Sequence, residues 1–191
     1  GQGFDAVTFV TFAEPLLEQA RSVLDIPVVS MLESSLLTAC SLARRMALIT
    51  LGDENVMRLR EQVERHCLHD RIAGFYPLVP AVTEFDLARA FTRPDPVIDA
   101  FLSTARRAVA AGAGVVIPAE GVLNEVLAAA GVKAVEGAPV MDCVAVALAQ
   151  TEMMVALRRR VGMAVGRRWD NARVPEALKR SFPDIFGPEP E

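Results

Sequence analysis

The stretch Met-Ala-Leu-Ile-Thr-Leu at residues 46–51 is a short aliphatic run that Gly52 and Asp53 end. A charged segment with a helical pattern follows it, over about residues 54–66. A short apolar strand followed by a crossover helix is typical of parallel sheets. This stretch therefore predicts the α/β fold class, with residues 46–51 as one strand of a parallel sheet.

The same alternation continues on both sides of this stretch. Further strands are expected at residues 7–10, 26–31, 72–78, 115–117 and 132–135. Further helices are expected at residues 14–24, where Glu14 and Pro15 begin the helix, and at 33–44, 96–111, 121–130 and 139–160.

The spacing of these elements predicts two lobes joined by residues 79–95. We expect residues 1–80 to form a first lobe that is incomplete at its N-terminus. Residues 81–138 would form a second lobe, 139–165 a long helix that packs back between the lobes, and 166–191 a C-terminal tail. Gly1 and Gly3 resemble the glycines that follow helix ends, so we expect further sequence before residue 1.

The composition excludes several classes of protein. The 191 residues carry 20 Lys and Arg against 24 Asp and Glu, a net charge of −4, which argues against a nucleic-acid partner. The most apolar stretch, residues 108–119, holds two glycines and a proline and is too short to span a membrane. Three cysteines are too few for a disulfide framework. We expect a cytoplasmic protein that binds neither nucleic acid nor membrane.

Two strand-to-helix turns are the candidate positions for chemistry. Ligands of parallel α/β sheets bind beyond the carboxyl ends of strands, where helix N-termini present free N–H groups. One such turn is Thr-Phe-Ala-Glu-Pro at residues 11–15, and the other is Pro-Ala-Glu-Gly at residues 118–121. Two similar turns from two similar halves are expected to face each other across a cleft.

The sequence resembles the aspartate/glutamate/hydantoin racemase superfamily, nearest its hydantoin and allantoin racemase branch. The resemblance lies in residues 3–50, 60–78, 105–121 and 139–152. It implies two pseudo-symmetric lobes, each with a parallel sheet flanked by helices, and an active site between them. It also implies stereoisomer interconversion without a cofactor, in which one cysteine thiolate removes a Cα proton and a second thiol returns it.

The sequence departs from this family at both cysteines. The family pattern Cys-Phe-Gly-Asp-Pro aligns with residues 11–15 and places Thr11 at the first cysteine. The pattern Gly-Cys-Ala-Gly aligns with residues 118–121 and places Ala119 or Glu120 at the second. Cys40, Cys67 and Cys143 align elsewhere, so the two-thiol mechanism does not carry over.

Glu120 and Thr11 are the candidate catalytic residues. A carboxylate in a closed cleft can replace a thiol as the proton-transferring base, and the alternative for Glu120 is a first-turn carboxylate that stabilises its helix. The Thr11 hydroxyl is expected to bind substrate or water, or to act as an N-cap. Candidate substrate-binding residues, through backbone or side chain, are Phe12, Ala13, Glu14, Thr50, Ala119 and Gly121. Thr50 ends a strand on the ligand side, where it either binds a carboxylate or satisfies local backbone groups. Glu33, which begins a helix near the same rim, has the same two alternatives.

No metal or cofactor is expected. The cluster His66-Cys67-Leu68-His69 has no second pair to complete a tetrahedral site. The pair Gly112 and Gly114 precedes its strand, whereas a dinucleotide-binding glycine run follows one.

These observations predict a cofactor-independent isomerase, similar to a racemase or epimerase, or a related lyase. Its substrate would be a small carboxylate or amide-like molecule, and we expect a homo-oligomer. The alternative is a catalytically degenerate relative that binds small carboxylates or serves in assembly. An unrelated flavodoxin-like binding module would leave the recurrence of two lobes unexplained.

Overall fold

The computed structural model describes residues 3–181, and its central strand is β3 (Met46–Thr50). All five residues of β3 are buried. The strand pairs in parallel with β4 (Ile72–Pro77) on one side and β5 (Val115–Pro118) on the other. The aliphatic run at residues 46–51 is therefore the middle of a three-stranded parallel sheet, as its lack of charged residues favours.

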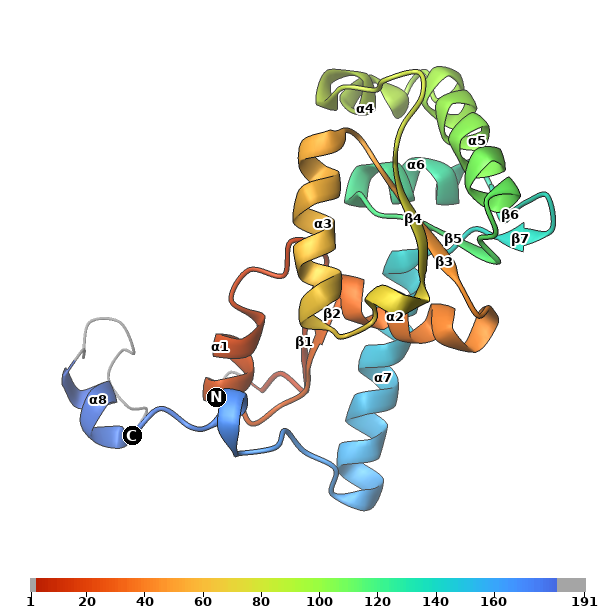
Figure 1. Ribbon diagram of the computed structural model, residues 1–191. Helices are drawn as coiled ribbons and strands as arrows, with labels where there is room; N and C mark the ends of the chain where they lie inside the picture. The colour runs from red at the N-terminus through yellow and green to blue at the C-terminus, as the bar shows by residue number, and fades with distance from the viewer. Residues whose placement is uncertain (1–2, 182–191) are drawn as a thin grey trace.

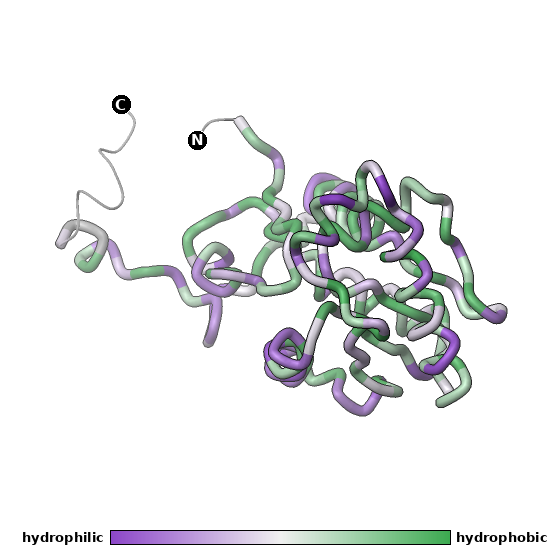
Figure 2. The backbone as a smooth tube through the Cα atoms, turned by 90° about the horizontal axis from the view of Figure 1, so that it is seen from above, coloured by the Kyte–Doolittle hydropathy of each residue, from purple (hydrophilic) through white to green (hydrophobic). Residues whose placement is uncertain are grey.

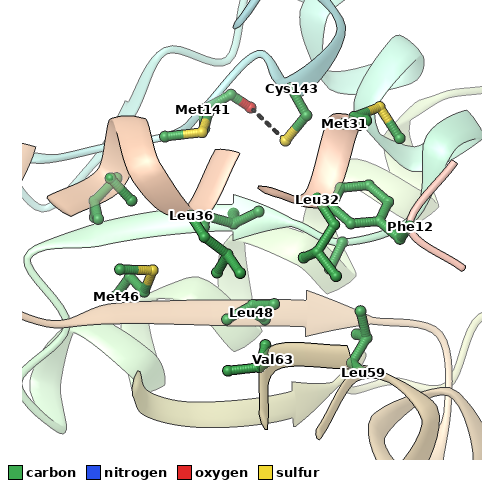
Figure 3. Close-up of a cluster of buried hydrophobic side chains, with 14 of the residues drawn as sticks. Phe12, Met31, Leu32, Leu36, Met46, Leu48, Leu59, Val63, Met141 and Cys143 are labelled. Carbon is green, nitrogen blue, oxygen red and sulfur yellow. Dashed lines mark hydrogen bonds between the residues drawn. The ribbon is translucent and has the colours of Figure 1, made fainter. Parts of the chain in front are cut away.

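Helices cover both faces of this sheet (Figure 1). Met46 and Leu48 contribute to one cluster, with α2 (Met31–Leu42), α3 (Asp53–Arg65) and α7 (Cys143–Val161). Figure 3 shows this cluster, in which Leu48 lies between residues of α2 and α3. Ile49 contributes to the opposite cluster, which is built from α4 (Glu84–Ala90), α5 (Asp95–Ala110) and α6 (Gly121–Ala129). Alternate residues of a strand point to opposite faces, so one short strand supplies both cores.

A second parallel sheet consists of β1 (Val7–Phe9) and β2 (Val28–Ser30), connected by α1 (Leu17–Val23). Helix α7 packs against both strands and against α2. The hydroxyl groups of Thr8 and Thr151 form a 2.7 Å hydrogen bond between β1 and α7. Two parallel sheets flanked by helices confirm the predicted α/β class.

Several element boundaries differ from those predicted. The first helix begins at Leu17 rather than at Glu14, because Glu14 and Leu16 have positive φ angles of 48° and 59°. The predicted connection at residues 79–95 contains α4, which starts with a capping box between Thr83 and Asp86. The last long helix begins at Cys143 rather than at residue 139, with Asp142 as its N-cap.

The strand expected at residues 132–135 is one arm of a short hairpin. It is β6 (Ala134–Val135), and it pairs antiparallel with β7 (Ala138–Pro139). Glu136 and Gly137, between the two arms, both have positive φ angles, which suit a tight hairpin turn. In the described residues β6 pairs with β7 and is not a strand of the parallel sheet around β3.

The predicted lobe boundary at residue 80 cuts through the three-stranded sheet, since β3 and β4 share it with β5. The hydrogen bonds between β3 and β5 join residues far apart in the sequence, such as Met46 and Val115. In the predicted tail, the 3-10 helix η2 (Trp169–Asn171) packs on α1. Helix α8 (Glu176–Ser181) lies apart from the other elements in both views (Figures 1 and 2). Gly1 and residues 182–191 of the tail lie outside the described residues.

Across residues 3–181, no helix has the combination of length and apolar character needed to cross a membrane.

Candidate functional site

The two predicted strand-end turns border one cavity of about 420 Å³. This volume is within the range of cavities that hold small molecules. We call it the Glu120 cavity. Seven of the predicted site residues line it, namely Thr11, Phe12, Ala13, Thr50, Ala119, Glu120 and Gly121.

These residues meet because strands of the two parallel sheets end at this point. Thr11 follows β1, Thr50 is the last residue of β3, and Ala119 follows β5. The Ala119 N–H donates to the Ile49 carbonyl at 2.7 Å, so pairing with β3 continues past the end of β5. Phe12 is buried and lies beside Leu32 in Figure 3, which anchors the first turn to the core.

Glu120 both lines the cavity and caps α6. One carboxylate oxygen, Oε2, accepts the Leu123 N–H at 2.5 Å. Among residues 3–181, the N–H groups of Gly121 and Val122 have no protein acceptor, as expected in the first turn of a helix. The two roles predicted as alternatives for Glu120 are thus compatible in one side chain. At its α6 wall the cavity has the Glu120 carboxylate and the free N–H of Gly121.

Thr11 is not the N-cap of a helix. Its Oγ1 atom accepts the N–H of Ala13 at 3.3 Å, and α1 starts only at Leu17. This hydrogen bond closes a small turn of the kind that threonine often forms with the residue two positions later. The prediction of an N-cap at Thr11 is therefore wrong, whereas its place on the cavity wall leaves the hydroxyl near any bound molecule.

Glu14 does not line the Glu120 cavity. Its carboxylate is buried and accepts hydrogen bonds from the Ser30 hydroxyl and, at 3.3 Å, from the Glu33 N–H. Its other oxygen lies 2.7 Å from Nε2 of His66. Glu14, Glu33 and His66 line a neighbouring cavity of about 400 Å³, which we call the His66 cavity. The place of Glu14 in the His66 cavity does not favour the prediction that it binds substrate in the Glu120 cavity, and nothing tests that prediction directly.

The environment of His66 shifts its protonation. Burial lowers the pKa of His66, but the hydrogen bond and negative charge of Glu14 and the charge of Glu33 outweigh it. The pKa of His66 therefore lies above its ordinary value of 6.5. Arg21, which forms an ion pair with Glu33, opposes this rise. The two carboxylates thus favour the imidazolium form of His66 over the neutral ring.

Five further polar residues of the Glu120 cavity escaped the sequence analysis. Glu84 comes from α4, and the others come from α3: Asn55, Arg58, Glu61 and Gln62. Positions 55, 58 and 62 recur every three or four residues and form a stripe on α3 next to the buried Leu59 and Val63. That spacing is visible in the sequence, but nothing local indicates that the stripe faces the turn at residues 11–13.

No cysteine lines the Glu120 cavity. Cys143 is fully buried, and its Sγ lies 3.8 Å from the Met141 carbonyl oxygen (Figure 3). Burial raises the pKa of the Cys143 thiol to about 12, against a smaller opposing effect of a hydrogen bond with Ser35. Cys67 is exposed and Cys40 half-buried, both as free thiols. Nothing in this arrangement supplies a thiolate at the position of the family's cysteines.

The histidines of the cluster at residues 66–69 separate. His66 contacts Glu14, whereas His69 is exposed and lies 3.3 Å from Asp70. In the part of the chain that the structure describes, no three side chains of His, Cys, Asp or Glu are arranged to hold a metal ion.

Comparison with known proteins supports the resemblance. A family model described as Asp/Glu/Hydantoin racemase matches residues 1–151. No curated protein matches the sequence. Among solved structures, the fold is similar to that of allantoin racemase from Klebsiella pneumoniae, with a TM-score of 0.74 and 20% identity over 92% of this chain and 67% of that one. It is also similar to allantoin racemase from Pseudomonas fluorescens, with a TM-score of 0.73 and 22% identity over 92% of this chain and 70% of that one.

Proposed function

Because the chain belongs to the Asp/Glu/hydantoin racemase family, we propose that it is a cofactor-independent isomerase or a related lyase. The reaction would move a proton at a carbon next to a carboxylate or carbonyl group of a small molecule. The observation that carries the proposal is the Glu120 cavity, where a carboxylate, a hydroxyl and free amide donors border one space. We also take the turns at residues 11–15 and 118–121 as counterparts in two pseudo-symmetric halves.

In the proposed reaction, Glu120 is the base. The Leu123 N–H holds Oε2, which leaves the other oxygen, Oε1, to accept the proton from the substrate carbon. The electron pair left on that carbon spreads onto the adjacent carbonyl or carboxylate oxygen. The N–H groups of Gly121 and Phe12 would stabilise this developing negative charge.

The proton then returns to the carbon, either from Glu120 or from water. Return from water on the opposite face inverts the carbon, and Glu120 gives its proton to solvent. Among the described residues no carboxylate or imidazole lies within hydrogen-bond distance of the Thr11 hydroxyl, so we assign it to holding this water or the substrate. In a lyase, the same electron pair would instead expel a leaving group.

The substrate class follows from the family and the cavity. The family description includes hydantoin, and both similar structures carry the name allantoin racemase. These are cyclic amides in which an acidic C–H lies next to a carbonyl group. A cavity of about 420 Å³ suits a molecule of this size.

The direct test is loss of the Cα proton in D₂O, followed by proton NMR. The compounds are enantiopure allantoin, 5-substituted hydantoins and α-amino acids. We expect exchange with the wild-type protein and at least about a hundredfold slower exchange with Glu120→Gln, the lower end of a general base's contribution. Glu125→Gln is the matched control, since Glu125 is an exposed carboxylate of the same helix outside the cavity. Equal exchange in the wild type and Glu120→Gln removes Glu120 from the mechanism.

The alternative is a relative that binds a small carboxylate or takes part in assembly without catalysis. The replacement of both family cysteines favours it, and so does the use of one Glu120 oxygen as a helix cap. A thermal-shift screen of the same compounds separates the two functions. Stabilisation by a compound whose Cα proton never exchanges supports the binding protein.

A further inference from the structure

The turn at residues 11–13 is a wall shared by two cavities. Ala13 and Gln62 line both the Glu120 cavity and the His66 cavity. Thr11 and Phe12 face the Glu120 cavity, and Glu14 faces the His66 cavity. A movement of Glu14, on the His66 side, is therefore two residues along the chain from the Phe12 N–H, which is proposed to bind an anion.

This turn needs contacts from elsewhere to hold its shape. Glu14 and Leu16 both lie in the left-handed region of backbone conformation, which residues with a Cβ atom disfavour. Leu16 is exposed and contributes little packing. Glu14, in contrast, is buried and has hydrogen-bonded partners on three sides. The Glu14 carboxylate is thus the main anchor of the strained part of the turn.

The last turns of α3 supply two of the anchoring contacts. Nε2 of Gln62 donates to the Ala13 carbonyl at 3.1 Å. His66, the C-cap of α3, contacts Glu14 at 2.7 Å. Oε1 of Gln62 is buried and has no hydrogen-bond partner among the described residues. Ala13 of the turn and Glu14 just after it are thus held by one helix, whose other side chains line the Glu120 cavity.

We infer that His66 is a positioning residue of the Glu120 cavity: through Glu14 it fixes the turn at residues 11–13, and its protonation sets the affinity of the cavity for a small carboxylate. This inference rests on the proposed function, because it concerns the anion-binding amides of that site. His66 does not itself line the Glu120 cavity.

The charges around His66 fix the direction of the effect. Glu14 comes from the turn and Glu33 from α2, with Nδ1 of His66 lying 3.9 Å from Glu33. The charged groups that line the His66 cavity with it are Glu14, Glu18, Arg21, Glu33, Arg65 and Asp170. Below the pKa of His66, an imidazolium donates to a carboxylate, which is stronger than a hydrogen bond from neutral imidazole. As pH rises through that pKa, the anchor weakens, and carboxylate affinity falls.

The first test needs no substrate. The amide signals of Phe12 and Ala13 are followed by ¹⁵N NMR over a pH titration, together with the imidazole signals of both histidines. We expect the two amides to shift with the midpoint of His66 in the wild type and in His69→Gln. His69 is the matched control because it is the other histidine of the chain and is exposed. In His66→Gln, which keeps a donor but does not titrate, we expect the amides not to show that midpoint.

The second test measures acetate binding by NMR. At about pH 6, where His66 is protonated, we expect the dissociation constant to rise about tenfold in His66→Ala, as loss of a charged hydrogen bond implies. His66→Gln should restore most of this affinity and remove its dependence on pH. The wild-type titration and His66→Gln decide the question even where His66→Ala fails to fold.

The inference is overturned if the amide signals of Phe12 and Ala13 do not shift at the midpoint of the His66 titration, or if they shift at the same midpoint in His66→Gln. It is also overturned if the wild type and His66→Ala bind acetate with equal affinity. The proposed function survives the last of these results. A different result separates the two proposals: the amide signals titrate with His66, but the protein neither binds acetate nor exchanges the Cα proton of any compound. This result supports the positioning role of His66 and rejects the proposed function.

Discussion

The carboxylate of Glu120 accepts the backbone N–H of Leu123 at 2.5 Å, so one side chain both caps α6 and borders the candidate site. Its contribution to folding is separable from any contribution to chemistry. Glu120→Ala removes the cap, and we expect the free energy of unfolding to fall by about 1 kcal/mol. Glu120→Asn keeps a capping oxygen without the carboxylate and should lose less than half of that amount. Urea denaturation measures both, and equal losses in the two variants contradict the capping role.

The His66–Glu14 pair predicts a pH dependence of stability. A group whose pKa is raised on folding stabilises the folded state below its unfolded pKa, and this stabilisation is lost as pH rises through the folded pKa. Since the pKa of His66 lies above 6.5, the stability difference between wild type and His66→Gln should be largest below about pH 6.5 and shrink at alkaline pH.

The measurement is chemical denaturation across this pH range. His69→Gln is its control, since His69 is exposed and bonded only to an exposed partner. A difference between wild type and His66→Gln that grows with rising pH would show that His66 is buried in its neutral form.

The buried thiol of Cys143 should resist alkylation. Burial raises its pKa to about 12, so at about pH 8 almost no thiolate forms, and reagents do not reach the sulfur. We expect iodoacetamide to modify the exposed Cys67 in the native protein and Cys143 only after unfolding. Peptide mass spectrometry of protein labelled with and without urea gives the answer. Native labelling of Cys143 at the rate of Cys67 contradicts the described packing.

Two arginines of the segment after α7, Arg167 and Arg173, bond to α1 or to Asp25 just after it. Arg167 donates to the Arg21 carbonyl at 2.6 Å and to the Asp25 carboxylate at 2.7 Å. The arginines at positions 167 and 173 lower the pKa of Asp25 despite the opposing effect of desolvation. We expect Arg167→Ala to speed chymotrypsin cleavage near Trp169 severalfold, because local opening exposes the backbone there.

Arg168→Ala is the matched control for this cleavage, since Arg168 is exposed and, among the described residues, forms no hydrogen bond or ion pair with α1. Chymotrypsin is used because it does not cut at arginine, so neither variant removes a cleavage site. Equal cleavage rates for the two variants would show that Arg167 does not hold the segment.

Local pattern was sufficient for most of the fold. The strands at residues 46–51 and 72–78 and the helices at 54–66 and 96–111 were predicted within about two residues of their ends. Apolar periodicity reports which side of an element is buried, and this property depends only on neighbouring residues. The two strand-end turns were found for the same reason, because the ends of strands are marked in the sequence.

What local pattern missed depended on partners far along the chain. Glu14 appeared to start a helix, but its contact with His66, 52 residues away, stabilises a left-handed turn instead. The α3 stripe at Asn55 and Gln62 became part of the site only through packing against the turn at residues 11–13.

The sequence by itself determined the α/β class, the family resemblance and the two turns that carry Thr11 and Glu120. Each of these features depends on residues that are close together in the sequence. Tertiary structure alone decided that β3 lies between β4 and β5, that the two turns share one cavity, and that His66 anchors one of them. The reason is physical. Hydrogen bonds and burial between distant segments depend on how the whole chain packs, and no single stretch of sequence contains that information.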